Sequence, residues 1–320
     1  MLRLYKNLRA SDCILIVLIV GITVLQVFLT IQLTDQISAI VGAIQCVSEK
    51  LPGWDTGDIW REGGIMLAYA VGSALCLAAT GVTASHVASR LSATLRNEVY
   101  KKTESFSIAE INKFSTASLI TRTTNDIQQI HMANLLVLRM LIYAPIMAIW
   151  AICKINASSW QLTSATVVTV VVLVICILAI MLTVLPKFKL MQKLTDKLNG
   201  VTRENLTGIR VVRAYNAEKY QENKFEKANK EITGTQLFTG RVMALMNPLM
   251  MLAMNGLTLA IYWIGASLMN AGEIEYQTIV AFMTLASQVI MAFLMLLMMF
   301  VLLPRAQVAA KRINEVLSTP

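Results

Sequence analysis

Side chains that commonly bind metals are few in this chain and far apart in the sequence. The 320 residues include two histidines, His86 and His131, and five cysteines, none of them in a CxxC pair. Such a pattern lacks the ligand spacing of a metal site and the paired spacing of a disulfide framework. We therefore expect no metal site and inert thiols. The cysteines lie within or beside apolar runs, at Cys13, Cys46, Cys76, Cys153 and Cys176.

Nucleotide hydrolysis is a second chemistry for which the usual binding loop is missing. No GxxxxGK[ST] sequence occurs, so no segment of this chain matches the loop that cradles nucleotide phosphates. The net charge of +9 comes from basic residues that flank apolar runs. Because the basic residues are clustered in this way, the charge indicates a membrane protein, and we expect no nucleic-acid partner.

The elements that position these side chains are predicted to be membrane-spanning helices. Hydrophobic residues make up 56% of the chain and charged residues only 15%, whereas a soluble protein carries about a quarter charged residues. Six uncharged runs are present, and five of them exceed the roughly 20 residues that cross a bilayer as a helix. The first run is too long for a cleavable signal, so we expect it to remain as an anchor. We predict an all-α membrane protein with spans at about 13–46, 63–89, 131–153, 161–185, 242–269 and 277–303.

Lysine and arginine residues are concentrated in every second segment between the predicted spans, which places them on one side of the membrane. Of the 28 basic residues, 24 lie before the first span, between spans two and three, between spans four and five, or after the last span. The positive-inside rule therefore places both termini in the cytoplasm of a multi-pass protein. The two long inner connections, 90–130 and 186–241, carry apolar residues every three or four positions. This periodicity predicts helical hairpins that extend beyond the bilayer by about 25–30 Å.

Four stretches carry a resemblance to a known family. They are 119–127 (LITRTTNDI), 138–145 (LRMLIYAP), 204–218 (ENLTGIRVVRAYNAE, followed by Phe225) and 305–317 (RAQVAAKRINEVL). Together they resemble the transmembrane domain of bacterial ABC exporters of the multidrug type, which have long intracellular helices. The third stretch is the most specific, because it is similar to the ExxxGIxxVKAFxxE sequence around the second coupling helix of that family.

The resemblance implies a nucleotide-binding domain that drives transport and that this sequence does not contain. Residues 304–320 resemble the linker to a nucleotide-binding domain, and the sequence stops where that domain would begin. The domain was either trimmed or belongs to a separate chain, and it would bind ATP and Mg. The complete transporter would then be an ATP-hydrolysing translocase of the bacterial cell membrane. The second stretch is typical of heterodimeric exporters, so the resemblance implies a second half on a different polypeptide, although homodimer and heterodimer both stay open.

The same resemblance assigns coupling roles to the tips of the two hairpins. The tip at 213–219 is similar to the coupling helix that docks on a nucleotide-binding domain, with Tyr215 as the aromatic contact. The other tip lies near 108–112, and Asn125 and Asp126 are expected to brace its hairpin. The coupling candidates are Arg213, Ala214, Tyr215, Asn216, Glu218, Ile108, Glu110 and Asn112.

Polar, aromatic and methionine residues within the spans are candidates for a substrate cavity. Arg139 is costly inside a membrane and either faces a water-filled path or braces a neighbouring helix. Asp35 is expected near the outer surface, as a solvated carboxylate or as part of an outer gate. Spans five and six hold eleven of the eighteen methionines, whose flexible thioethers suit guests of varied shape. The cavity candidates are Arg139, Asn247, Asn255, Gln288, Met250, Met254, Met295, Tyr143, Phe282 and Phe293.

The predicted function is therefore the membrane half of an ATP-driven exporter of small amphiphilic compounds, whether drug-like, lipid or peptide. An ion-coupled secondary carrier is an alternative, but it should show acidic residues or histidines in mid-membrane and broken helices. A membrane sensor or scaffold with the same fold is another. The sequence does not identify the substrate, the partner half or the residues that line the cavity.

Overall fold

The computed structural model describes residues 10–49, 55–158 and 160–319, and every regular element within these ranges is a helix. The N-terminal basic residues Arg3, Lys6 and Arg9, used above for orientation, lie outside the described residues, as does Lys50. The chain divides into two compact units. The first comprises the described parts of Met1–Thr163 and Ile261–Pro320, and the second comprises Ser164–Ala260.

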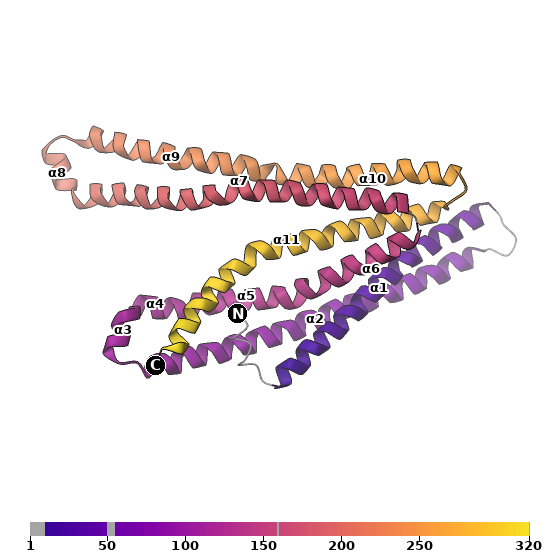
Figure 1. The fold of residues 1–320 in the computed structure, drawn as a ribbon, viewed down its shortest axis with the longest axis horizontal. Coiled ribbons are helices and arrows are strands. Elements are labelled where there is room, and N and C mark those ends of the chain that lie inside the picture. Colours follow the sequence, from indigo (N-terminus) through magenta and orange to yellow (C-terminus); the bar gives the residue numbers. More distant parts are fainter. Residues whose placement is uncertain (1–9, 50–54, 159, 320) are drawn as a thin grey trace. The chain divides into compact units, whose positions relative to one another are not determined.

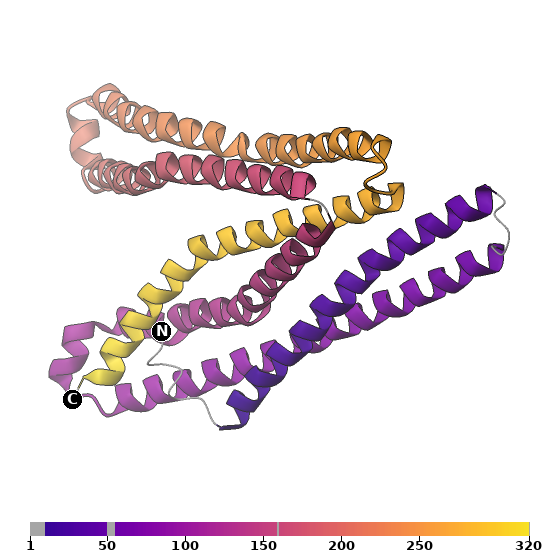
Figure 2. The ribbon, with the colours of Figure 1, turned by 45° about the vertical axis from the view of Figure 1, so that its right-hand side comes forward.

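The first unit begins with two long helices that lie side by side. Helix α1 (Ala10–Ser48) packs along α2 (Thr56–Glu104), as Figures 1 and 2 show. Asp55 caps α2, because its carboxylate accepts the backbone N–H of Thr56 at 2.7 Å. The remaining elements of this unit are α3 (Ile108–Phe114), α4 (Thr116–Thr121), the π-helical turn η2 (Arg122–Asp126), α5 (Ile127–Leu136), the π-helical turn η3 (Val137–Leu141), α6 (Ile142–Ser158) and α11 (Tyr276–Ser318).

Two buried clusters hold the apolar parts of the first unit together. One joins α1, α6 and α11 and is formed by Val27, Ile31, Ala144, Met147, Ala148 and Ala292. The other joins α1, α2 and η3 and is formed by Ile19, Ala84, Val87 and Leu138. Small alanines at these positions let neighbouring helices approach closely, which is how helices pack in lipid. These clusters therefore fix α1, α2, α6 and α11 as one bundle.

A third buried cluster lies where the helices of the first unit become charged, and we call it the stem cluster. It shows that α11 does not end near 303, where the last span was predicted to end, but continues as helix to Ser318. The continuation packs on α2, α4 and α5 through its apolar positions. The stem cluster consists of Leu91, Leu95, Val99, Phe106, Leu119, Ile127, Ile130, Ala309, Ala310, Ile313 and Val316.

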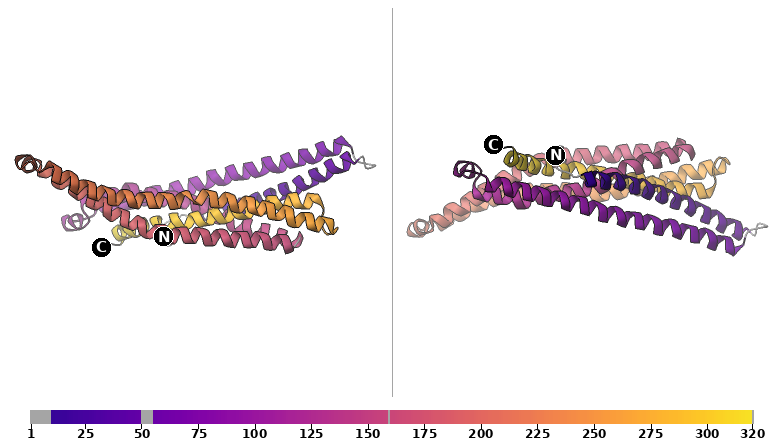
Figure 3. Two further views of the ribbon diagram at one scale, coloured as in Figure 1. Left: turned by 90° about the horizontal axis from the view of Figure 1, so that it is seen from above. Right: turned by 90° about the horizontal axis from the view of Figure 1, so that it is seen from below.

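The second unit is a long antiparallel hairpin. Helix α7 (Trp160–Thr207) runs down to the short α8 (Ile209–Ala214), and the chain returns through α9 (Glu218–Ala244) and α10 (Met246–Asn270). Helices α7 and α9 lie side by side with α8 at the end of the pair (Figures 1 and 3). The first four residues of α7 and the last ten of α10 belong to the first unit.

Six helical stretches are long and apolar enough to cross a membrane, counting only the part of the chain that the structure describes. They are Ser11–Ser48, Thr56–Glu104, Thr116–Ile155, Trp160–Thr207, Glu218–Asn270 and Tyr276–Leu296. Each of the six predicted spans overlaps one of them. Trp60, Trp160 and Trp263 are exposed near the ends of α2, α7 and α10 that lie away from the charged hairpins. Tryptophan favours the membrane–water interface, so these side chains are suited to mark one boundary of the apolar layer.

Candidate functional site

The tip of the second hairpin is a short helix followed by a tight turn. Helix α8 comprises Ile209–Ala214, and Tyr215, Asn216 and Ala217 form the turn before α9 begins at Glu218. Asn216 has a φ of 51°, a left-handed conformation that asparagine tolerates better than most residues. The helical segment therefore lies a few residues earlier than the predicted 213–219, because this turn ends it. Arg213 and Ala214 are in the helix, whereas Glu218 opens the next one.

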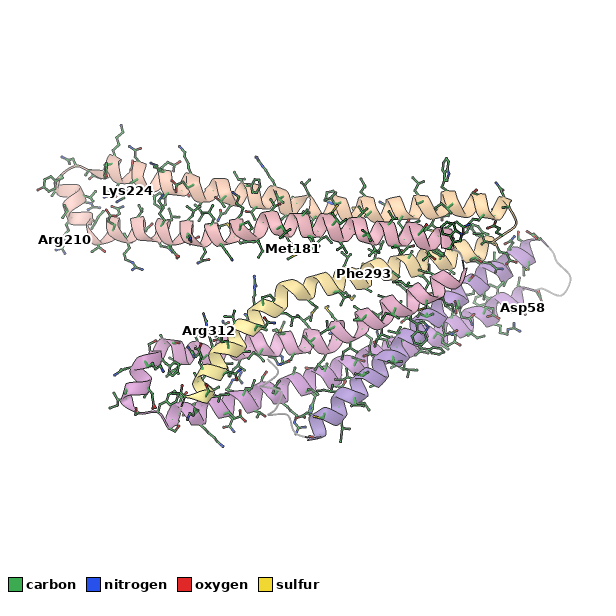
Figure 4. The ribbon with its side chains drawn as sticks, in the orientation of Figure 1. Asp58, Met181, Arg210, Lys224, Phe293 and Arg312 are labelled. Carbon is green, nitrogen blue, oxygen red and sulfur yellow. The ribbon has the colours of Figure 1, made fainter. Side chains whose placement is uncertain are left out.

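Tyr215 presents its ring to solvent at this tip. Its side chain is 81% exposed, and Val211 is also exposed, while Val212 is the buried residue of α8. A large aromatic ring that no neighbour covers is unusual at the end of a water-exposed hairpin, and aromatic residues are enriched at the centres of protein interfaces. Arg210, labelled in Figure 4, adds positive charge to the same short helix. The arrangement suits docking on another protein surface.

Ion pairs between α7 and α9 brace the hairpin behind this tip. The Lys224 ammonium group lies 2.7 Å from a carboxylate oxygen of Glu204, and the Lys197 ammonium group lies 2.6 Å from Glu231 (Figure 4 labels Lys224). The Lys197 hydrogen bond holds the pKa of Glu231 below its ordinary value, although desolvation opposes it. Exposed pairs contribute little stability individually, about 0–1 kcal/mol each. Their placement across two helices nevertheless resists sliding of α9 along α7.

The tip of the first hairpin is the helix α3. Its start is a capping box, in which the Glu110 carboxylate accepts the backbone N–H of Ser107 at 2.7 Å. Glu110 therefore caps the start of the helix, which the sequence interpretation did not anticipate. Ile108 and Asn112 are exposed on α3. Ile108 thus exposes an apolar side chain at the start of α3, whereas Tyr215 is exposed after the end of α8.

Arg122 contacts both this tip and the end of α11, and each of its guanidinium nitrogens has a partner. Its Nη1 donates to the backbone carbonyl of Arg312 at 2.6 Å, and its Nη2 lies 3.2 Å from the Glu315 carboxylate. Its Nε donates to the Ser118 hydroxyl at 3.3 Å, and its guanidinium carbon lies 4.8 Å from the centre of the Phe114 ring. Only 12% of the Arg122 side chain is exposed. The sequence did not predict these contacts, which join residues about 190 positions apart.

Asp126 lies one turn further along and is almost fully buried. One of its carboxylate oxygens is 3.8 Å from the Arg312 guanidinium group, while the other has no hydrogen-bond partner among the described residues. Asp126 thus pairs with α11, outside the hairpin that it was predicted to brace, and the bracing role stays a prediction. Asn125, which was predicted to share that role, is exposed.

Candidate cavity residues in the first unit fall into two kinds of environment. Tyr143, Phe293 and Met295 pack against the α1–α6–α11 cluster, so the fold brings three predicted candidates together. The Gln288 side chain donates to the Thr34 hydroxyl at 3.4 Å, and its amide oxygen lacks a partner among the described residues. Phe282, in contrast, is enclosed by its neighbours. In this conformation Phe282 is a packing residue.

The other cavity candidates lie on exposed or partly covered helix faces. Arg139 is exposed within η3, and π-helical turns are frequently found at functional sites. In the second unit, the amides of Asn247 and Asn255 are exposed, whereas Met250 and Met254 are partly covered. Each of these side chains is available for contact with a molecule outside its own unit. Their cavity role stays a prediction.

Asp35 and Lys154 form an ion pair that the sequence did not reveal. They lie on α1 and α6, 119 positions apart, and each side chain is about one-third exposed. Lys154 was expected in a loop, but α6 continues past it to Ser158. The Asp35 carboxylate is therefore paired with a cation and is not simply solvated. The pair links two spans at the end that carries the exposed tryptophans.

Among the described residues, no group of three or more histidine, cysteine, aspartate or glutamate side chains is placed to hold a metal ion. All five cysteines are free thiols. The structure instead shows exposed hairpin tips, ion pairs that link neighbouring helices, and polar side chains among apolar helices. Six spans with long charged hairpins define a multi-pass membrane protein of the transporter type.

Comparison with known proteins identifies the family. Residues 13–293 match the ABC transporter transmembrane region, and the chain belongs to that family. It is 34% identical over 276 residues to an uncharacterized ABC transporter ATP-binding protein of Mycobacterium tuberculosis, covering 86% of this chain and 47% of that protein. It is 28% identical over 269 residues to the uncharacterized ABC transporter ATP-binding protein YfiB of Bacillus subtilis, covering 83% of this chain and 46% of that protein.

A third relative has a named activity. The chain is 25% identical over 201 residues to an ATP-dependent lipid A-core flippase of Syntrophus aciditrophicus, covering 60% of this chain and 32% of that protein. This chain thus spans about half the length of the first two relatives and about a third of the flippase.

Proposed function

We propose that this chain is the membrane-spanning half of an ATP-driven ABC exporter, providing the substrate pathway and the coupling helices. The nucleotide-binding domain, with its ATP and Mg, would follow residue 320 or reside on a separate chain. The first two relatives support this arrangement, since they are named ATP-binding proteins and extend well beyond the part that matches. Both termini of this chain would be cytoplasmic, in the cell membrane of a bacterium.

One observation carries the proposal: the second hairpin ends in an exposed tip with an uncovered aromatic ring, and ion pairs link the two helices behind it. From Lys187, the first charged residue after the apolar part of α7, to Thr207 the helix extends about 30 Å. A charged helical hairpin of that length would not be stabilised by lipid, and the Tyr215 ring at its tip is exposed. A motor that closes on ATP can move distant spans only by pushing a stiff element. Helices α7, α8 and α9 meet that requirement.

The substrate proposed is a small amphiphilic compound, of drug-like, lipid or peptide type. Within this class, the flippase among the relatives favours a lipid substrate. Exposed amides at Asn247 and Asn255, with methionines beside them, offer hydrogen bonds within an apolar surface. A second transmembrane half, on a different polypeptide, would complete the pathway. An ion-coupled carrier gains no support from Asp35, which is paired with Lys154 on helices that continue unbroken there. A sensor or scaffold would share this fold, and substrate-stimulated ATP hydrolysis in the complete transporter separates it from an exporter.

The test is a coupling measurement on the complete transporter. The triple variant Arg213→Ala, Tyr215→Ala, Glu218→Ala should retain basal ATP hydrolysis but lose most substrate-stimulated hydrolysis and transport. Tyr276→Ala is the matched control, because Tyr276 is also an exposed tyrosine but lies at the start of α11, at the end of that helix away from the stem cluster. The control should transport normally. Normal transport by the triple variant would contradict the coupling role of α8.

A further inference from the structure

The contacts of Arg122 extend beyond what a coupling helix requires for docking. They join the end of α3 and the turn η2, which are close in sequence, to the last turns of α11, which are about 190 positions away. Each bond is made by a different part of one guanidinium group. Arginine is suited to this, because its planar fork presents several donors in fixed directions. A lysine could make only part of this set.

Two charged residues of the π-helical turn contact the same partner helix. Arg122 and Asp126 are the first and last residues of η2. They are four positions apart, and residues at that spacing share one face of a helix. Arg122 therefore contacts Glu315 and the Arg312 carbonyl group, and Asp126 contacts the Arg312 guanidinium group. The two charge pairs have opposite polarity, which fixes the register of α11 on η2.

We propose that Arg122, Asp126, Arg312 and Glu315 form an ionic latch, with Arg122 as its positioning residue, that makes α3 and the last turns of α11 one mechanical body. The latch rests on the proposed function, because it would pass a movement of α11 to α3, the tip that is proposed to dock on the nucleotide-binding domain. A change in the membrane part of α11 then moves α3 as well. The unpartnered oxygen of Asp126 and its 3.8 Å separation from Arg312 leave room for this arm to tighten.

The stem cluster and the latch make separate contributions. Apolar packing by Ala309, Ala310 and Ile313 holds α11 against the hairpin without regard to charge. It also touches α3, because Ile111 and Phe114 pack against its margin and the Phe114 ring stacks on that of Phe106 at 5.8 Å. Arg122 adds a charged group that contacts both Phe114 and α11. The latch therefore predicts that α3 and α11 loosen together when Arg122 is changed.

Hydrogen–deuterium exchange on the complete transporter in nanodiscs tests this directly. Arg122→Gln should speed exchange about tenfold both in α3 and in residues 305–318, and Arg122→Lys should recover only part of the protection. Glu315→Gln, at a half-exposed site, is a milder variant that should give about a two- to threefold increase in the same two segments. Lys102→Met is the matched control, because Lys102 lies over the neighbouring Phe106 ring at 5.9 Å but belongs to α2 and not to α3 or α11. Its effect should stay below twofold.

The functional measurement is substrate stimulation of ATP hydrolysis by the same variants. Arg122→Gln should reduce stimulation severalfold, and Lys102→Met should not. Unchanged exchange in α3 while 305–318 loosens, or full recovery by Arg122→Lys, would overturn the latch. Unchanged stimulation in Arg122→Gln would overturn its role in coupling. If the parent transporter itself shows no transport, the proposed function fails, while the exchange result still decides whether the latch exists.

Discussion

Removing the side chain of Ile313 tests whether α11 is held to the first hairpin by the stem cluster. Ile313 is 0% exposed and lies in that cluster with Leu95, Ile127 and Val316. Ile313→Ala removes three carbon groups, worth about 0.8 kcal/mol each in transfer free energy. The cavity left behind adds to this, so local opening of the last turns should become easier by about 3 kcal/mol.

Exchange of the backbone amides in 305–318 is the assay for this change. A shift of about 3 kcal/mol corresponds to roughly a hundredfold faster exchange through local opening. Val308→Ala is the control on the same helix, because Val308 is 55% exposed and its loss should change exchange less than threefold. Equal effects of the two substitutions would show that the end of α11 is not packed as described, and the reasoning on the stem cluster would then be refuted.

Three further predictions follow from other contacts. Gly265→Ala should destabilise the bundle by about 1–3 kcal/mol, because its Cβ would lie 2.8 Å from Cδ1 of the buried Ile279, whereas Gly256→Ala meets nothing within 4 Å and should be neutral in thermal unfolding. Because Lys197 lowers the folded-state pKa of Glu231 from an ordinary 4.5, their pair should hold α7 and α9 together at neutral pH and weaken as the pH falls through that lowered pKa. Spin-label distances between the two helices should broaden only in that acidic range, and Glu231→Gln should remove the pH dependence. Asp35→Asn and Lys154→Met should each weaken the link between α1 and α6, and equal thermal stability of both single variants and the parent would show that the pair contributes nothing.

The apolar runs predicted the helices well because lipid imposes a single requirement on all of them. A span must be long, uncharged and internally hydrogen-bonded, and each of these properties is local in the sequence. Residues 304–320 were described only as a linker, without a helix, because Pro304 and four charged residues interrupt the apolar pattern after the last span. A signal was nevertheless present: Ala306, Ala309, Ile313 and Val316 recur every three or four positions. That spacing is typical of a helix with one buried face.

The tips were predicted less accurately, because short helices depend on local caps and turns. The left-handed conformation of Asn216 ends α8 before Tyr215, and the sequence offered only the weak preference of asparagine for such turns. The ion pairs were not predictable at all. Asp35 with Lys154, and Arg122 with Glu315, join positions more than 100 residues apart. Only the packing of whole helices brings them together, and one sequence carries no record of it.

The most direct test of the account is the side of the membrane on which α8 lies. Tyr215→Cys, in a chain whose five native cysteines are replaced by serine, places a thiol at a site that is 81% exposed. A membrane-impermeant maleimide should label it in inverted membrane vesicles and leave it unlabelled in intact cells. Labelling from outside intact cells would contradict the central claim, because a hairpin on the outer surface could not receive force from a cytoplasmic ATP-driven motor.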